Sequence, residues 1–115
     1  MKTLSVDMKR NGEVAVIRPN GRLDAFEAPM VAEALAELEQ AHVHYIVINL
    51  AHVDFLDSIA LSTLVQGIKH ALQSGGDLCL CSVQQPVQII FELTRLDKVF
   101  QIFDTEENAV SAICL

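Results

Sequence analysis

The sequence predicts a single α/β domain spanning residues 1–115, with a mixed β-sheet of about five strands packed by about four helices. Strand-like segments alternate along the chain with amphipathic helical segments, which is typical of an α/β sheet. A length of 115 residues fits one hydrophobic core. Hydrophobic residues make up 51% of the chain and charged residues 20%, which predicts a folded domain and excludes a disordered segment.

The first two strands are expected to form an antiparallel pair. Apolar and polar residues alternate over Leu4–Met8, which indicates a half-buried strand. Asn11-Gly12 follows and is a strong signal for a hairpin turn. The second strand covers Val14–Ile17 and ends at Pro19-Asn20-Gly21.

A first amphipathic helix is expected over about residues 26–41. Asp24 lies just before it as a candidate capping residue. Pro29 falls in the first turn, where backbone N–H groups have no partner within the helix. Glutamates occupy the polar side, and the apolar side carries Phe26, Met30, Val31, Ala34, Leu35 and Leu38.

A central strand and a second helix come next. Val43–Leu50 is nearly continuous in apolar and β-branched residues, which indicates a strand covered on both faces. Residues 51–56 are expected to form a connecting segment that contains one short run of apolar residues. Asp57-Ser58 opens the second helix, and Gly75-Gly76 ends it.

The same alternation continues to the C-terminus. Leu78–Val83 is expected to be a strand, and Pro86 starts a third helix, a position that proline favours. Val99–Phe103 is expected to be a short strand. Thr105 caps a terminal helix that has two glutamates in its first turn.

The charge of the chain argues against two classes of partner. There are 15 acidic and 8 basic residues, a net charge of −7, whereas a nucleic-acid binder needs a basic footprint. Nucleic acid and anionic membrane surfaces are therefore not expected as partners. No apolar run approaches the roughly 18 residues of a membrane span, and Asp7 interrupts any signal-peptide core, so a cytoplasmic location is expected.

The cysteines and histidines do not form a recognisable metal site. Cys79 and Cys81 would point to one face of a strand. With Cys114 the count is odd, which indicates reduced thiols that fill the core. His42 and His44 could share a strand face, but no third ligand lies at metal-binding spacing. No metal and no cofactor are therefore predicted.

Common catalytic motifs are also missing. No serine lies in a G-x-S-x-G turn, and neither a phosphate-binding loop nor a G-x-G-x-x-G run occurs. Asp54 and Asp57 could suggest general acid–base catalysis. However, the dipole of a helix by itself favours carboxylates just before the helix. An enzyme with a small-molecule substrate is not predicted.

Ser58 stands at the start of the second predicted helix, where a serine can have two meanings. It can act as the N-cap, accepting a hydrogen bond from a free backbone N–H, which stabilises by about 0.5–2 kcal/mol. It can also belong to an anion site, because free N–H groups and the helix dipole favour negative charge there. The local sequence favours the N-cap, because serines are common at that position.

Several segments together resemble the STAS domain of bacterial anti-sigma factor antagonists, over nearly the whole chain. Its features are a Gly-x-Leu-Asp loop, a central strand, an Asp-Ser pair before a helix, a two-glycine turn and a Ser-x-x-x-Pro link. In this sequence they are Gly21-Arg22-Leu23-Asp24, Ile48-Asn49-Leu50, Phe55-Leu56-Asp57-Ser58, Gly75-Gly76 and Ser82 to Pro86.

The resemblance assigns roles to individual residues. The family motif before the second helix reads Asp-Ser-Ser/Thr-Gly-Leu-Gly, and the serine directly after the aspartate is the phosphoacceptor. This position is Ser58, with Asp57 and Leu61 matching the Asp and Leu of the motif. Asp24 matches the loop aspartate that lies near the acceptor.

Three positions depart from that motif. Ile59 replaces Ser/Thr, and Ala60 and Ser62 replace the two glycines. Alanine and serine are better helix formers than glycine, by up to about 1 kcal/mol each, so the fold should not suffer. The phosphoacceptor is intact, and the changes bear on which partner kinase fits.

The function implied by the resemblance is partner switching. An anti-sigma factor antagonist is a bacterial, cytoplasmic phosphoprotein that regulates transcription. Its unphosphorylated form binds an anti-sigma factor that is also a serine kinase and so releases the sigma factor. Phosphorylation of Ser58 ends the binding, and a phosphatase resets it. The expected docking residues are Asp24, Asp57, Ser58, Ile59, Leu61 and Ser62.

A second function remains open from the sequence. STAS domains also serve as accessory subunits of transport or multi-protein signalling complexes, without control of a sigma factor. The departures at Ala60 and Ser62 keep that alternative open.

Overall fold

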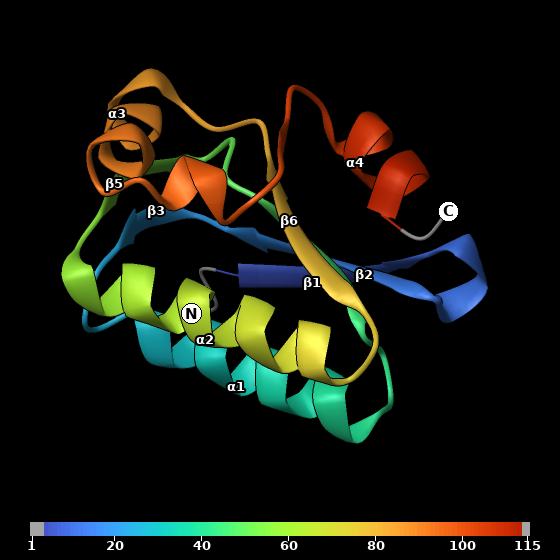
Figure 1. The fold of residues 1–115 in the computed structure, drawn as a ribbon. Helices are drawn as coiled ribbons and strands as arrows, with labels where there is room; N and C mark the ends of the chain where they lie inside the picture. The colour runs from blue at the N-terminus through green and yellow to red at the C-terminus, as the bar shows by residue number, and fades with distance from the viewer. Residues whose placement is uncertain (1–3, 114–115) are drawn as a thin grey trace.

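The computed structural model describes residues 4–113 and confirms the predicted class, an α/β domain with a five-stranded mixed sheet and four α-helices in that range (Figure 1). The strands and helices follow the predicted alternation, with two short additional strands. In chain order they are β1 Leu4–Lys9, β2 Val14–Pro19, β3 Gly21–Leu23, α1 Ala28–Gln40, β4 Tyr45–Asn49, β5 Val53–Leu56, α2 Ser58–Gln73, β6 Asp77–Cys81, α3 Gln85–Leu93, β7 Ile102–Phe103 and α4 Glu106–Ile113.

The main sheet has the order β1-β2-β4-β6-β7. The predicted hairpin is confirmed, since β1 runs antiparallel to β2 with Leu4 opposite Pro19 and Lys9 opposite Val14. The other neighbours are parallel. Each parallel connection therefore needs a crossover, and helices supply it.

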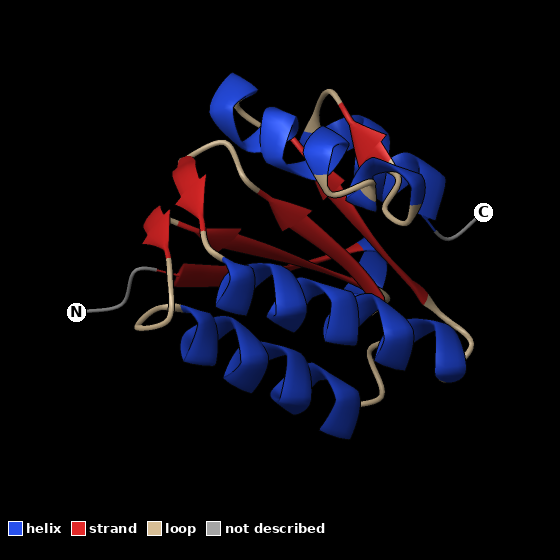
Figure 2. Ribbon diagram, turned by 60° about the vertical axis from the view of Figure 1, so that its left-hand side comes forward, coloured by secondary structure: helices blue, strands red, loops and turns tan. Residues whose placement is uncertain are grey.

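The helices cover both faces of this sheet. α1 and α2 lie side by side on one face, and α4 lies on the other (Figures 1 and 2). β2 shows why both faces are buried: Ala15 and Ile17 join the core under α1 and α2, while Val14 and Val16 join a smaller core under α4. The run of apolar residues in β2 is thus divided between two cores by the two-residue period of a strand.

Several predicted segments have different boundaries in the structure. The strands expected over Val43–Leu50 and Leu78–Val83 cover Tyr45–Asn49 and Asp77–Cys81. The helix expected over residues 26–41 begins at Ala28, so Phe26 precedes it. The strand expected over Val99–Phe103 is reduced to its last two residues, because a 3-10 turn over Leu96–Lys98 comes first. That turn carries Phe100 into the core, where its ring lies edge-on to the ring of Phe91 with centroids 5.9 Å apart.

The two strands that the sequence analysis missed form a separate parallel pair. β3 and β5 have three and four residues, and Leu23 lies opposite Leu56. The register shifts between Gly21 and Arg22, so the pair lacks a regular alternation that the sequence could reveal. It extends the scaffold beyond the end of β2 and leads directly into α2.

The cysteine prediction is confirmed for the two described thiols. Cys79 and Cys81 are both free and buried, in the core under α4. Burial raises the pKa of Cys79 to about 12 and that of Cys81 to about 11, so both thiols stay protonated and unreactive. Cys114 lies outside the described residues. No helix among residues 4–113 is long and apolar enough to cross a membrane.

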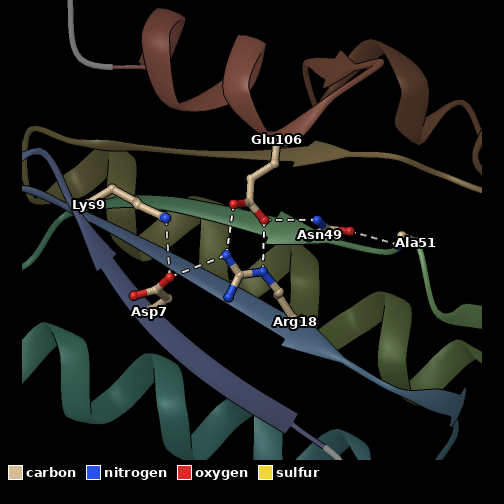
Figure 3. Close-up of polar contacts among 6 residues, drawn as sticks. All are labelled: Asp7, Lys9, Arg18, Asn49, Ala51 and Glu106. Carbon is tan, nitrogen blue, oxygen red and sulfur yellow. Dashed lines mark hydrogen bonds and ion pairs between the residues drawn. The ribbon is translucent and has the colours of Figure 1, made fainter.

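An ion-pair network fixes α4 against the sheet (Figure 3). Arg18 on β2 donates two hydrogen bonds of 2.8 Å to the two carboxylate oxygens of Glu106 on α4. Asn49 on β4 donates a third, 2.9 Å long, and Asp7 and Lys9 extend the network along β1. The hydrogen bonds from Arg18 in particular hold the pKa of Glu106 below its ordinary value of 4.5.

We expect Glu106→Gln to lower the free energy of unfolding by about 1–2 kcal/mol at pH 7, because a neutral amide cannot accept the charge-assisted bonds from Arg18. A carboxylate with a lowered pKa stabilises the fold above its ordinary pKa, and that contribution is lost as the pH falls through the lowered value. Urea denaturation should therefore show the difference from wild type shrinking below about pH 4.5. Glu107→Gln, at an exposed neighbour, should change stability by less than about 0.5 kcal/mol at either pH.

The two-glycine turn after α2 gives a second prediction. Gly76 packs against the backbone of His44, whose carbonyl oxygen accepts the Asp77 N–H at 3.0 Å, and a Cβ at residue 76 would overlap that carbonyl. Gly75 has a φ of +85° but open space around it. We expect Gly76→Ala to cost more than about 3 kcal/mol and Gly75→Ala about 1–2 kcal/mol. Thermal unfolding of both variants would test this order, and equal losses would contradict it.

Candidate functional site

The start of α2 is organised by the carboxylate of Asp57. Asp57 is the N-cap residue of α2, and its Oδ1 accepts the backbone N–H of Ala60 at 2.9 Å. Its Oδ2 accepts the backbone N–H of Ala25 at 2.9 Å. One carboxylate thus caps α2 and binds the loop between β3 and α1 to it.

Ser58 is the first residue of α2 and not its cap, which corrects the N-cap role that its local sequence favoured. The reason is that Asp57 already has the extended backbone of a cap residue and makes the capping hydrogen bond. Ser58 is exposed, and its hydroxyl has no hydrogen-bond partner among residues 4–113. Its hydroxyl is consequently available to another molecule at no cost to the helix cap.

The pair of strands β3 and β5 brings the two predicted aspartates to one edge of the molecule. Asp57 donates its backbone N–H to the carbonyl oxygen of Leu23 at 3.3 Å. Asp24 follows Leu23 directly, just as Asp57 follows Leu56 in the neighbouring strand. Asp24, Asp57 and Ser58 therefore lie at one edge of the molecule.

Asp24 caps a turn that precedes α1, whereas the sequence analysis expected it to cap the helix itself. Its Oδ1 accepts the backbone N–H groups of Phe26 and Glu27 at 3.0 and 3.3 Å. The helix itself begins at Ala28, with Pro29 in its first turn. This turn projects the side chain of Phe26 outward, 89% exposed, so the prediction that Phe26 is part of the buried helix face is wrong.

Arg22 was not predicted as a site residue, yet it lies on the same edge. Its guanidinium carbon is 4.0 Å from the centroid of the Phe55 ring. Its Nε is 4.0 Å from Oδ2 of Asp24. Only the pairing of β3 with β5, which places Arg22 opposite Phe55, creates this contact, so the sequence alone held no signal for it.

The other predicted docking residues divide between surface and core. Ile59 is 52% exposed although it is apolar, and Ser62 is exposed as well. Leu61 is partly buried and packs against the core. Ala60, where the family motif has glycine, is buried, so its methyl group is accommodated.

A groove of about 320 Å³ runs between α1 and α2 beyond this edge. Ser62 and Thr63 belong to its wall near the first turn of α2, and His44 and His70 line it farther along. Gly67 lets the two helices approach, because a Cβ there would press on side-chain atoms of Leu35 and Leu78. Within residues 4–113 no three metal-binding side chains gather into a cluster.

Comparison with known proteins identifies the family of this chain. The family model described as "STAS domain" matches residues 5–109. The anti-sigma F factor antagonist of Paenibacillus polymyxa is 29% identical over 111 residues, which cover 96% of this chain and 95% of the relative. An anti-sigma-factor antagonist (STAS) domain protein from Planctomyces limnophilus has a similar structure, with a TM-score of 0.85, 25% identity and coverage of 97% and 98%.

A further solved structure supports the fold alone. It is the phosphorylated form of the Bacillus cell fate determinant SpoIIAA, which superposes with a TM-score of 0.75 at 21% identity. The alignment covers 94% of this chain and 96% of that one.

The division of roles between Asp57 and Ser58 can be tested by stability. We expect Asp57→Ala to lower the free energy of unfolding by about 1–3 kcal/mol, because it leaves the N–H groups of Ala60 and Ala25 without their acceptor. Ser58→Ala should change it by less than about 0.5 kcal/mol. Chemical denaturation would measure both, with Asp54→Ala as a control carboxylate exposed on β5. A larger loss for Ser58→Ala than for Asp57→Ala would contradict the assignment.

Proposed function

The chain belongs to the STAS domain family, and from that premise we propose that it is an anti-sigma factor antagonist whose binding is switched off by phosphorylation of Ser58. The unphosphorylated protein would bind an anti-sigma factor that is also a serine kinase, and thereby free a sigma factor. A phosphatase would reverse the modification. The name of the Paenibacillus polymyxa relative, an antagonist of an anti-sigma factor, supports this role.

The exposed, unbonded hydroxyl of Ser58 carries the proposal. Because Asp57 makes the capping bond, a kinase could reach the Ser58 Oγ without breaking a hydrogen bond of the fold. In the transfer, this oxygen attacks the γ-phosphorus of ATP held by the kinase. The new O–P bond replaces the bond to ADP, and the hydroxyl proton passes to a base of the kinase.

The proposed docking surface surrounds this hydroxyl. It comprises Asp24, Asp57, Ser58, Ile59, Leu61 and Ser62, the residues expected from the sequence. The exposed side chain of Phe26 adds an apolar group next to Ala25, whose N–H bonds Asp57. Phe26 and Ile59 would supply apolar area to the complex, and exposed aromatic residues are frequent anchors of interfaces.

The switch would act through charge at the surface. Phosphorylation adds about −1.5 to −2 charge. At the start of a helix this charge is locally tolerated, with a favourable dipole term of about 0.3–1 kcal/mol, so the fold should persist. Against one like charge of a partner at about 4 Å, the repulsion is about 4 kcal/mol at an effective dielectric of 20, which corresponds to roughly a thousandfold in affinity.

The remaining features of the proposal follow from the same role. The protein would be a cytoplasmic bacterial regulator of transcription, and a binding module without catalytic activity of its own. Its partners would be proteins: the kinase, and the phosphatase that resets the switch.

The decisive experiment is incubation with the anti-sigma factor kinase of the same organism and ATP, followed by mass spectrometry. We expect the addition of one phosphoryl group that disappears in Ser58→Ala, and nearly identical far-UV circular dichroism before and after. Binding to the kinase should weaken about a hundredfold or more in Ser58→Asp, because a carboxylate imitates part of the phosphate charge. Ser58→Asn is the matched control, because asparagine has the shape of aspartate without its charge. Its affinity for the kinase should fall much less.

The outcomes separate the competing functions. No phosphoryl addition, together with stable co-purification in a transport or signalling complex, would replace the proposal with the role of an accessory subunit. If Ser58→Asp and Ser58→Asn bind the kinase equally well, charge does not explain how the switch works. A large loss of helix on phosphorylation would show a refolding switch instead of a surface switch.

A further inference from the structure

Arg22 is held at the same edge as Ser58 by contacts that leave most of its side chain free. The guanidinium carbon lies 4.0 Å from the centroid of the Phe55 ring, and the side chain is 63% exposed. A guanidinium stacked on an aromatic face keeps its N–H donors in the plane of the group, where they can still bind an anion. Its contact with Asp24 is long, with Nε 4.0 Å from Oδ2.

The backbone places Arg22 close to the phosphoacceptor. Arg22 lies opposite Phe55 in the pairing of β3 with β5, and Phe55 precedes Ser58 by three residues. The next residue of β3, Leu23, accepts the backbone N–H of Asp57 at 3.3 Å. Leu23 follows Arg22, and Asp57 precedes Ser58, so this hydrogen bond joins the two segments one residue away from both side chains.

A nearby cation would stabilise a phosphate at Ser58 further than the helix dipole does. Asp24 in the β3–α1 loop and Asp57 at the start of α2 would face it with like charge, and Asp54 lies exposed one position before Phe55. The N-terminus of α2 offers only about half an elementary positive charge, against the nearly two negative charges of a phosphate. Arg22 carries a full positive charge, and its contacts with Phe55 and Asp24 hold it at this edge.

We propose that Arg22 is the phosphate-binding residue of the modified protein. Its guanidinium leaves the long contact with Asp24 and donates two parallel N–H bonds to the phosphate on Ser58, the geometry that arginine and phosphate favour. This inference rests on the proposed phosphorylation of Ser58. It makes Arg22 a positioning residue for the switch, because it holds the new charge in place and is itself neutralised by it.

The test uses the full-length protein with phosphoserine installed at position 58 during translation, so that no kinase is required. The second pKa of the phosphate is followed by ³¹P NMR against pH. A neighbouring guanidinium favours the dianion, so we expect this pKa to be about 0.5 higher in Arg22→Gln than in the wild-type background, a threefold change in proton affinity typical of an exposed ion pair. In Arg22→Lys, which keeps the positive charge, the phosphate pKa should rise by no more than half of that amount.

Lys69→Gln is the matched control, because it removes one positive charge from the exposed side of α2, eleven residues and about 16 Å along the helix from Ser58. It should leave the titration unchanged. An identical titration in Arg22→Gln and the wild-type background would overturn the proposal. So would an equal shift in Lys69→Gln, or an Arg22→Lys variant that behaves as Arg22→Gln. Failure of the kinase assay would overturn the proposed function instead, since the phosphate here is installed independently.

Discussion

The carboxylate of Asp57 is the interaction on which the candidate site depends. One oxygen caps α2 through Ala60 and the other binds the β3–α1 loop through Ala25, both at 2.9 Å. These bonds satisfy two backbone donors that would otherwise need water. They also fix the loop of Asp24 beside the first turn of α2, while Ser58 keeps an unbonded hydroxyl. The residue that builds the site is therefore different from the residue proposed to be modified.

The remainder of the domain acts as a rigid support for this edge. Apolar side chains on the two faces of β2 belong to two separate cores, and the bonds between Arg18 and Glu106 hold α4 over the second core. Glycine is needed where elements approach most closely, at Gly67 between the helices and at Gly76 beside His44. A charge added outside both cores leaves this packing in place, which is why a surface switch is physically reasonable here.

The edge also carries features that belong to this chain in particular. Ala60 and Ser62 stand where the family motif has glycines, and the structure accommodates both, with Ala60 buried and Ser62 exposed. Exposed apolar groups at Phe26 and Ile59 adjoin a cluster of charges at Asp24, Asp57 and Arg22. A partner for this surface would therefore need both an apolar area and a compatible charge pattern, and the two requirements together restrict its choice.

The choice of Asp24, Asp57 and Ser58 as site residues came from the resemblance to the STAS domain family. The sequence by itself determined the alternation of strands and helices, the antiparallel first pair and the turn at Gly75-Gly76. These depend on local patterns with a period of two or 3.6 residues, and on turn residues. Only the tertiary structure decided which residue caps α2, because Asp57 and Ser58 both suit a cap and the second donor to Asp57 lies 32 residues away at Ala25. For the same reason the sequence analysis missed three further features: the β3–β5 pair, the outward side chain of Phe26 and the stacking of Arg22 on Phe55. Strands of three and four residues have little local preference, and they form where a distant segment supplies the other half of their hydrogen bonds.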